Sequence, residues 1–359
     1  MDLLAAYGWT SYCAQQTPTQ DPDGSIPARI VSEQRGLYQA LTAQGELTVE
    51  LSGRLRHEAL SPQELPAVGD WVALRLAPDN QFGLILQVMP RKSRISRGAP
   101  GRTAQEQILA ANVDTAFVVT TADKDFNPRR LERYLAVIWD GAARPVILIN
   151  KIDLCADSAG LLAQAGLAFP GVDIHPISAL QGQGLGPLSA YLKPERTCVM
   201  LGSSGVGKST LLNRIIGKDV ARLGAVRQAD QRGRHTTTSR QMFILPSGGL
   251  LIDTPGLREL RLGKADDGLR RAFADIGSLS QRCRFRDCRH IDEPGCAVLA
   301  ALQNGTLARS HYDNYLKLQK EQDYQRRRED PALEAQNKKR WKSIHKTMRS
   351  FDKLTRGEE

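Results

Sequence analysis

The sequence has no long apolar run, and this absence limits where the chain can reside. Although 41% of its 359 residues are hydrophobic, no stretch approaches the roughly 18 consecutive apolar residues that a membrane-spanning helix needs. The first ten residues, MDLLAAYGWT, also lack the basic start and the cleavage site of a secretory signal. We therefore expect a cytoplasmic protein that does not contact a membrane.

Cysteine is scarce, with six residues in the chain. Three of them are scattered and are expected to stay unpaired in a reducing compartment: Cys13, Cys155 and Cys198. The other three lie with a histidine in the spacing C-x4-C-x-H-x5-C: Cys283, Cys288, His290 and Cys296. Three thiolates and one imidazole complete a tetrahedral shell, so this spacing predicts one structural zinc ion. Buried free thiols and a surface histidine are the alternative. His311 lies outside the pattern and is expected on a helix surface.

Acidic residues are outnumbered, with 39 Asp and Glu against 49 Lys and Arg, which gives a net charge of +10. This surplus indicates a polyanionic partner, and charge alone leaves nucleic acid and an acidic membrane surface both open. Residues 317–359 contain 13 basic and 8 acidic residues. We interpret them as an RNA-contacting tail; a solvated helix would explain the composition equally well.

The N-terminal part of the chain predicts an arm followed by a small barrel. In residues 1–27 a short apolar start leads into the polar stretch TPTQDPDGS. Five short strands follow, bounded by Gly, Pro, Asn or Asp, at residues 28–34, 36–42, 46–53, 69–76 and 82–89. This pattern is typical of an oligonucleotide-binding (OB) barrel. The basic residues 91–102 are then either a solvated linker or a contact to a nucleic-acid backbone.

Residues 201–213, LGSSGVGKSTLLN, carry the strongest motif. An expected buried strand precedes them and a helical pattern follows, ending at Gly217. A phosphate-binding loop lies between the two, and its nucleotide-binding residues are Gly202, Ser203, Ser204, Gly205, Val206, Gly207, Lys208, Ser209 and Thr210. The glycines let backbone N–H groups turn toward a polyphosphate. Lys208 is expected to reach the β- and γ-phosphates and Ser209 to bind Mg²⁺. A Gly/Ser-rich turn is the alternative.

Strand and helix alternate from Val113 onward, which predicts a parallel α/β sheet. One strand ends in Asn150, Lys151, Ile152 and Asp153, at the sheet edge where α/β proteins bind ligands. Asp153 can accept two hydrogen bonds from guanine, whereas adenine lacks both donors in that arrangement. A further strand ends at Ser178 and Ala179, where a backbone amide can meet the guanine oxygen.

A polar segment without clear periodicity, residues 219–240, follows the phosphate loop and contains the sequence RHTTT. Sensing of a γ-phosphate requires a mobile loop with a threonine, so Thr237 and Thr238 are expected near the magnesium ion. Two strands then form either a hairpin or a neighbouring strand pair, and the second of them ends in DTPG, residues 253–256. Asp253 would hold the metal through a water, and the Gly256 amide would touch the γ-phosphate.

The order of these motifs is unusual, because the base-reading residues precede the phosphate loop by about fifty positions. A circular permutation gives this order without changing the sheet, since new termini in a surface loop leave the packed core intact. The segment after Gly256 then leads directly into the C-terminal domain.

Together the motifs NKID (150–153), GSSGVGKST (202–210), RHTTT (234–238), DTPG (253–256) and CRFRDCRHIDEPGC (283–296) resemble those of the bacterial small-subunit-dependent GTPases, the RsgA family. The resemblance covers residues 28 to about 320. It implies a multidomain chain with an OB-type barrel (28–100), a circularly permuted α/β GTPase domain (101–265), a mainly helical zinc-binding domain (266–316) and a basic tail (317–359).

The resemblance also implies a function. It implies GTP hydrolysis, stimulated by the small ribosomal subunit, in late maturation of that subunit, with binding of ribosomal RNA, GTP and GDP; we expect a monomer. A phosphate-loop ATPase or kinase is one alternative, although it has no use for NKID. An RNA-binding zinc protein with a vestigial nucleotide site is another, although Lys208, Ser209 and Asp253 are intact.

Hydrolysis needs a group that orients the attacking water. Many GTPases place a Gln directly after DxxG, but this chain has Leu257 there. The nearest candidate is His235, which we predict to act with Lys208 and Thr238; contact with RNA is its alternative role.

Overall fold

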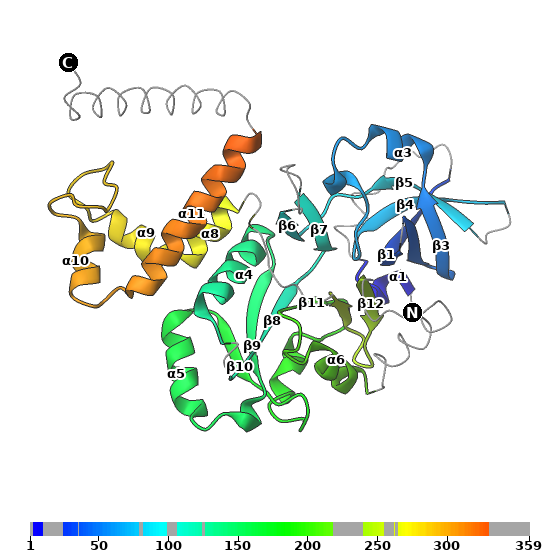
Figure 1. Cartoon of the computed structure of the whole chain (residues 1–359). Coiled ribbons are helices and arrows are strands. Elements are labelled where there is room, and N and C mark those ends of the chain that lie inside the picture. The colour runs from blue at the N-terminus through cyan, green and yellow to red at the C-terminus, as the bar shows by residue number, and fades with distance from the viewer. Residues whose placement is uncertain are drawn as a thin grey trace, which may run out of the picture.

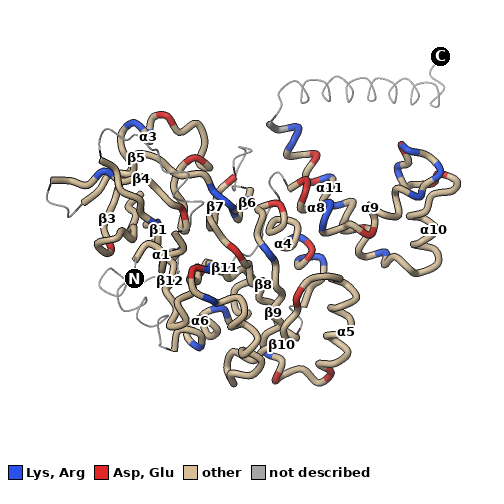
Figure 2. Tube along the Cα trace, turned by 180° about the vertical axis from the view of Figure 1, so that it is seen from behind, with Lys and Arg blue, Asp and Glu red and all other residues tan. Residues whose placement is uncertain are grey.

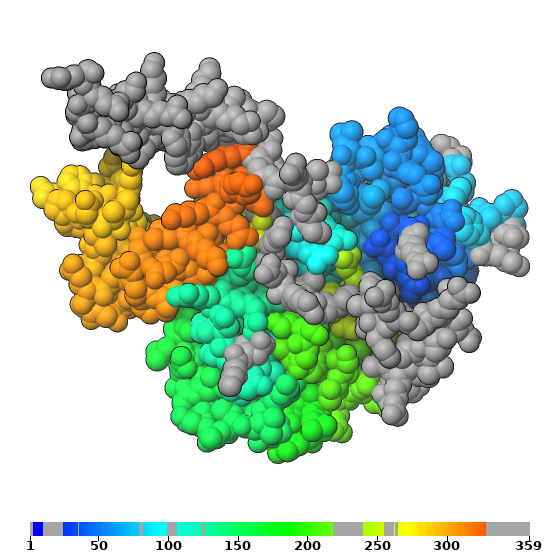
Figure 3. All heavy atoms as spheres, in the orientation of Figure 1, coloured from blue at the N-terminus to red at the C-terminus, as the bar shows by residue number. Residues whose placement is uncertain are grey.

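The computed structural model describes residues 3–9, 24–34, 36–78, 82–98, 106–123, 126–217, 240–254, 262 and 265–329. A β-barrel, a central α/β domain and a helical C-terminal module follow one another along the chain (Figure 1). The barrel and the C-terminal module lie on different sides of the α/β domain and form separate lobes (Figure 3). No helix in the described part is long and apolar enough to span a membrane.

Five strands form the barrel, as predicted. They are β1 (Ile26–Gln34), β2 (Leu37–Thr42), β3 (Gly45–Leu51), β4 (Trp71–Leu76) and β5 (Phe82–Val88). The barrel closes because β1 pairs with both β2 and β4, while β5 pairs with both β3 and β4. Ile30, Leu74 and Ile85 fill its interior and are fully buried. Two short helices, α3 (Gly53–Glu58) and η1 (Pro62–Glu64), connect β3 to β4.

The start of the expected N-terminal arm packs against the barrel. It forms a short helix, α1 (Leu3–Ala6), in which Leu4 is buried. Tyr7 is buried as well, and the ring of Trp9 meets that of Trp71 edge-on at 4.6 Å. Apolar side chains therefore hold this segment in place, whereas residues 10–23 lie outside the described part of the chain.

The basic stretch after the barrel is not a solvated linker over its first half. It forms β6 (Arg94–Gly98), which pairs with β7 (Glu106–Ala111). Arg91 donates two hydrogen bonds of 2.7 Å to the carboxylate of Asp70, which is completely buried. The linker interpretation is therefore wrong for residues 91–98, because pairing and a buried carboxylate fix this segment in the fold.

The central domain is the predicted α/β sheet. Its strands lie in the order β10 (Asp173–Pro176), β9 (Arg144–Asn150), β8 (Thr115–Thr121), β11 (Thr197–Leu201), β13 (Leu250–Asp253) and β12 (Arg240–Ile244). The first five strands in this order are parallel to one another, and β12 is antiparallel to β13. The helices are α4 (Pro128–Asp140), α5 (Ser158–Ala168) and α6 (Lys208–Ile216), with short turns η2 (Ile152–Leu154) and η3 (Gly186–Ala190). Every residue of β8 is buried, as expected for a parallel strand covered on both faces.

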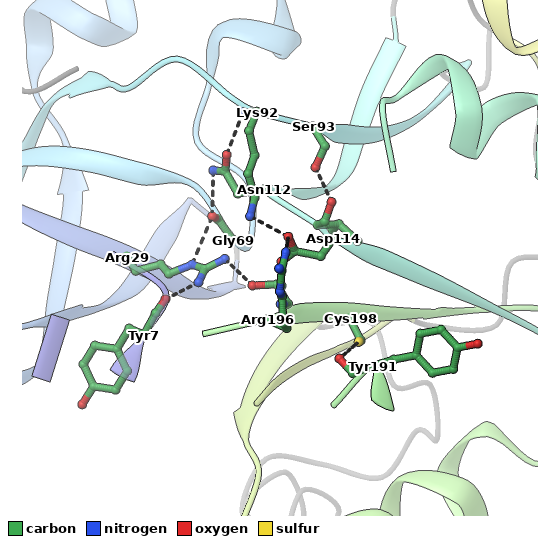
Figure 4. A network of polar contacts seen from close by, with 12 residues as sticks. Tyr7, Arg29, Gly69, Lys92, Ser93, Asn112, Asp114, Tyr191, Arg196 and Cys198 are labelled. Atoms are coloured by element: carbon green, nitrogen blue, oxygen red, sulfur yellow. Dashed lines mark hydrogen bonds and ion pairs between the residues drawn. The ribbon is translucent and has the colours of Figure 1, made fainter. Parts of the chain in front are cut away.

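A buried arginine joins the barrel to the amino-terminal end of this sheet. Arg29 is 1% exposed and donates to Gly69 O at 3.3 Å, to Thr197 Oγ1 at 2.8 Å and to the carbonyl of Tyr7 (Figure 4). Nearby, Asp114 accepts hydrogen bonds from Lys92 Nζ and from the Thr197 amide, both at 2.9 Å. The network therefore ties the arm and the barrel to the first residue of β11.

The C-terminal module consists of α8 (Asp266–Ala272), α9 (Ala274–Ser280), α10 (Ala297–Gln303) and α11 (Arg309–Glu329). Helix α8 lies directly on α4, because a Cβ at Gly268 would come within 1.8 Å of Ala136 O. Only glycine permits this approach. Helix α11 runs through position 317, where the sequence suggested that a tail begins, and residues 330–359 lie outside the described part.

His311 is not a surface residue, so that prediction is wrong. It lies on α11 with a side chain that is 16% exposed, and its Nδ1 is 2.7 Å from Glu132 Oε1 of α4. Its Nε2 is 3.2 Å from a carboxylate oxygen of Asp275 on α9. Glu132 is itself buried and also accepts a hydrogen bond from Asn314. The imidazole therefore joins the C-terminal module to the α/β domain.

This junction should make stability depend on pH. Burial alone would lower the pKa of His311, but hydrogen bonds and the negative charges of Asp275 and Glu132 raise it from 6.5 to about 9. Because the folded-state pKa lies above the unfolded one, the stabilisation is complete below about pH 6.5 and is lost as the pH rises through about 9. We expect a contribution of about 1–2 kcal/mol, since part of the pair is solvent-screened.

In thermal unfolding, the Tm of the parent should fall by about 1–3 °C more between pH 7 and pH 10 than that of His311→Gln. His57 is exposed on α3, so His57→Gln should retain the parental pH dependence. An equal fall in Tm between pH 7 and pH 10 for the parent and His311→Gln would contradict the proposed charge on His311.

Candidate functional site

Glycine conformations shape the loop between β11 and α6. Gly202, Gly205 and Gly207 have φ angles of 143°, 84° and 95°. A Cβ at Gly202 would lie 2.3 Å from Val119 O, and one at Gly207 would lie 2.4 Å from Asn150 Nδ2. The loop can therefore adopt this tight path only with glycine at both positions, as the motif predicts.

Lys208 begins α6 and turns back across the loop. Its side chain is 8% exposed, and Nζ donates to Gly202 O at 2.8 Å and to Ser203 O at 2.7 Å. Ser209 and Thr210 follow in the exposed first turn of α6. The ammonium thus lies inside a loop next to a helix N-terminus, which is the arrangement that binds polyphosphates.

Asn150, at the end of β9, connects two other loops. It is 3% exposed, and its Nδ2 donates to Val206 O at 2.7 Å, while its Oδ1 accepts from the Ala179 amide at 2.9 Å. The side chain therefore fixes the phosphate loop against the Ser178–Ala179 segment. In this structure the Ala179 amide therefore donates its hydrogen bond to Asn150.

Asp153 lies one turn further on, in η2. Its Oδ1 is buried and has no hydrogen-bond partner among the described residues. Lys151, in the left-handed conformation with φ 60°, places its Nζ 3.9 Å from Asp123 Oδ2. A buried acceptor without a donor is costly, and the two N–H groups of a guanine edge would satisfy it.

Asp253 occupies the end of β13, beside Met200 of β11 in register. Its Oδ1 is likewise buried without a partner among the described residues. Burial raises its pKa from 3.8 to about 6, although the charge of Lys208 acts in the opposite direction. Thr254 fixes the next turn by donating from Oγ1 to Met200 O at 2.6 Å. An unpaired carboxylate oxygen near Lys208 suits a divalent cation.

The cysteine and histidine side chains of the C-terminal module meet at one point. The ligand atoms of Cys283, Cys288, His290 and Cys296 all lie within 4.8 Å of one another. His290 Nδ1 faces the sulfur atoms, at 3.3 Å from Cys288 Sγ and 3.3 Å from Cys296 Sγ. These four residues could hold a metal ion, and three thiolates with one imidazole form the donor set of a closed tetrahedral site.

Residues around this cluster orient the imidazole. His290 Nε2 lies 3.0 Å from Ser280 Oγ, which in turn donates to Ile276 O at 2.8 Å. Tyr312 of α11 donates from its hydroxyl to His290 O at 3.0 Å. The contact with Ser280 fixes which ring nitrogen faces a metal, whereas Tyr312 holds the backbone of His290 in place. No spacing rule in the sequence identifies Ser280 or Tyr312, because their roles depend on the packing of α9 and α11.

Comparison with known proteins agrees with this geometry. Residues 88–263 match the family model described as RsgA GTPase. Over 360 residues the chain is 43% identical to the small ribosomal subunit biogenesis GTPase RsgA of Opitutus terrae, with 98% of each chain covered. The chain belongs to the RsgA GTPase family.

Solved structures similar to this RsgA-family chain support the same fold. The crystal structure of YjeQ from Thermotoga maritima aligns with a TM-score of 0.59 and 27% identity, covering 83% of this chain and 98% of that one. YloQ, described as a circularly permuted GTPase, aligns with a TM-score of 0.58 and 25% identity, covering 85% and 98%. The permuted order predicted from the motifs is thereby confirmed.

The structure brings together most, but not all, of the residues predicted for an RsgA-family site. The phosphate loop, the 150–153 segment, Ser178, Ala179 and Asp253 all lie at the same end of the sheet. His235, Thr237, Thr238 and Gly256 lie outside the described residues, so their roles stay predictions. The sequence analysis missed Arg214 of α6, which donates to the carbonyls of Ala179 and Leu180.

Proposed function

We propose that this RsgA-family GTPase hydrolyses GTP during late maturation of the small ribosomal subunit, while bound to the RNA of that subunit. The names of its relatives and the net charge of +10 support this proposal. The observation that carries it is the buried Oδ1 of Asp153, which has no hydrogen-bond partner among the described residues and follows the Asn150 that contacts the phosphate loop. Such an acceptor favours guanine over adenine. This same observation counts against an ATPase or kinase.

Two metal ions fit the residues of this chain. We propose one structural zinc held by the Cys283, Cys288, His290 and Cys296 cluster. We also propose that Mg²⁺ enters with GTP, near the Ser209 hydroxyl and Asp253, with Thr237 or Thr238 completing its surroundings. Mg²⁺ bound there would neutralise charge on the β- and γ-phosphate oxygens.

The remaining residues of the site have separate roles in this proposal. Lys208 offsets the charge on the phosphates, and Gly256 donates its amide to the γ-phosphate. His235 orients the attacking water. We further propose a cytoplasmic monomer whose barrel, permuted domain, zinc domain and tail follow the division drawn from the sequence.

GTP turnover measured with and without purified small subunits tests the proposed function. We expect saturating small subunits to raise kcat by at least about tenfold, because in this proposal RNA contacts complete the catalytic arrangement. Purified large subunits at the same concentration are the control and should leave kcat unchanged. Equal rates with the two kinds of subunit would contradict a role specific to the small subunit.

A His235→Ala variant added to the same experiment examines the catalytic assignment. It should bind GTP and subunits normally and lose most of the stimulated rate. A stimulated rate within about twofold of the parent would show that another group orients the water.

A further inference from the structure

Strand β12 lies between the barrel and the nucleotide site. Figures 1 and 2 both show β12 beside β1 of the barrel. In this antiparallel pairing Ser32 lies opposite Gln241, and Glu33 lies opposite Arg240. On its other side, Gln241 of β12 lies opposite Asp253 of β13. Ser32, Gln241 and Asp253 are therefore neighbours across three strands, and a strand spacing of about 4.8 Å puts Ser32 about 10 Å from Asp253.

The described part of the pairing between β1 and β12 is short. It comprises two residue pairs among the residues that the structure describes, whereas β12 and β13 share four. A slip of this pairing by one residue would turn every side chain of β12 to the opposite face of the sheet. Side-chain contacts beside the two described pairs therefore help to determine how β12 lies against the barrel.

Arg240 supplies such contacts. Its side chain is 13% exposed, and Nη1 donates to Ile108 O of β7 at 3.2 Å and lies 3.9 Å from Glu33 Oε2 of β1. A largely buried guanidinium is costly when its donors lose their partners. A shift of β12 along β1 would separate these groups, so the contacts of Arg240 favour the observed register.

We propose that Arg240 is a positioning residue that couples the barrel to the metal-binding carboxylate of the nucleotide site. By holding β12 against β1 and β7, it fixes the strand that pairs with Asp253. The inference rests on the magnesium role given to Asp253 in the proposed function. Because energetic coupling is reciprocal, a nucleotide bound with Mg²⁺ should in turn stabilise the β1–β12 pairing. A partner bound to the barrel would then act on the nucleotide site through the backbone.

The first test measures binding in the isolated protein. The affinity for a fluorescent non-hydrolysable GTP analogue is titrated with Mg²⁺ and again in chelator. In Arg240→Met the gain in affinity due to Mg²⁺ should fall by about five- to tenfold, as expected for a lost part-buried ion pair and hydrogen bond. The affinity for GDP in chelator should stay within about twofold.

Lys92→Met is the matched control. Lys92 also forms an ion pair at the junction of the barrel and the α/β domain, 2.9 Å from Asp114, but at the other end of the sheet. If Arg240 only stabilised the junction, both variants would behave alike. We expect the Mg²⁺-dependent gain of Lys92→Met to equal that of the parent, and equal losses in the two variants would overturn the inference.

Hydrogen exchange on the unmodified protein gives a second test that does not depend on a variant folding. When GDP is replaced by the GTP analogue with Mg²⁺, amides of residues 26–34 should exchange at least about threefold more slowly. Residues 45–51, on the far side of the barrel, should not change. Unchanged exchange in residues 26–34 would overturn the coupling.

The two proposals can fail separately. Neither the binding test nor the exchange test requires ribosomes. If both give the expected result but small subunits do not stimulate the protein, the coupling is supported and the proposed function is refuted. If small subunits stimulate the protein but Arg240→Met and Lys92→Met show the same Mg²⁺-dependent gain in affinity, only the proposed coupling is refuted.

Discussion

Asp153→Asn should lower the affinity for GTP at least about a hundredfold and leave the fold intact. The parent carboxylate offers two acceptors to the two N–H donors of guanine, whereas asparagine turns one N–H toward a donor. A site built for hydrogen bonding loses several kcal/mol when a buried group is left unpaired. Xanthine carries an oxygen where guanine carries its amine, so the variant should bind xanthine nucleotides better than the parent does.

The measurement is a competition titration of GTP, XTP and ATP against a fluorescent guanine nucleotide. Asp157→Asn is the control: Asp157 is exposed, caps α5 by accepting from the Gly160 amide, and can be replaced by Asn, which caps helices equally well. An unchanged GTP affinity in Asp153→Asn would remove Asp153 from the site. Equal binding of ATP and GTP by the parent would favour the ATPase alternative.

Cys288→Ala should abolish metal binding and unfold the zinc-binding domain, residues 266–316, while the α/β domain stays folded. The parent should contain one zinc per chain, and the variant less than about a tenth of that. A closed metal shell supplies much of the folding free energy of a small domain, and the segment between Cys283 and Cys296 contains no described helix or strand that could replace it.

Metal analysis of protein purified without chelator measures the stoichiometry, and limited proteolysis locates the unfolded region. Cleavage should appear in residues 281–296 and spare residues 144–150 of β9. Cys155→Ala removes a thiol outside the cluster and should keep the zinc. A parent without zinc, or a Cys288→Ala variant that resists protease as the parent does, would refute the assignment.

The sequence predicts those features that depend on neighbouring residues. Strands β8 and β9 follow from uninterrupted apolar runs, and Asn127 and Pro128 mark the start of α4 because capping is local. The phosphate loop is recognisable because its glycines and Lys208 act within a few residues of one another. The metal cluster follows from the spacing of its ligands for the same reason.

Contacts between distant parts of the chain explain what the sequence did not predict. His311 resembles any polar residue of an exposed helix until Glu132, 179 positions away, is placed beside it. Arg29 and Thr197 are 168 positions apart in the sequence, so the residues near either one do not indicate that the barrel and the α/β sheet meet there. The basic residues 91–98 suggest a linker because the buried carboxylate of Asp70 that binds Arg91 belongs to a different segment.

The strands of the barrel and of the α/β domain belong to one continuous sheet, which constrains how this chain can vary over evolution. Strand β1 is at once a wall of the barrel, through β2 and β4, and the cover of an otherwise open sheet edge at β12. An uncovered edge presents unpaired N–H and C=O groups that recruit other chains. A fragment lacking the barrel would therefore tend to self-associate. An insertion near Ser32 would have to preserve both the pairing of β1 within the barrel and its pairing with β12. The barrel therefore cannot be replaced independently of the α/β domain.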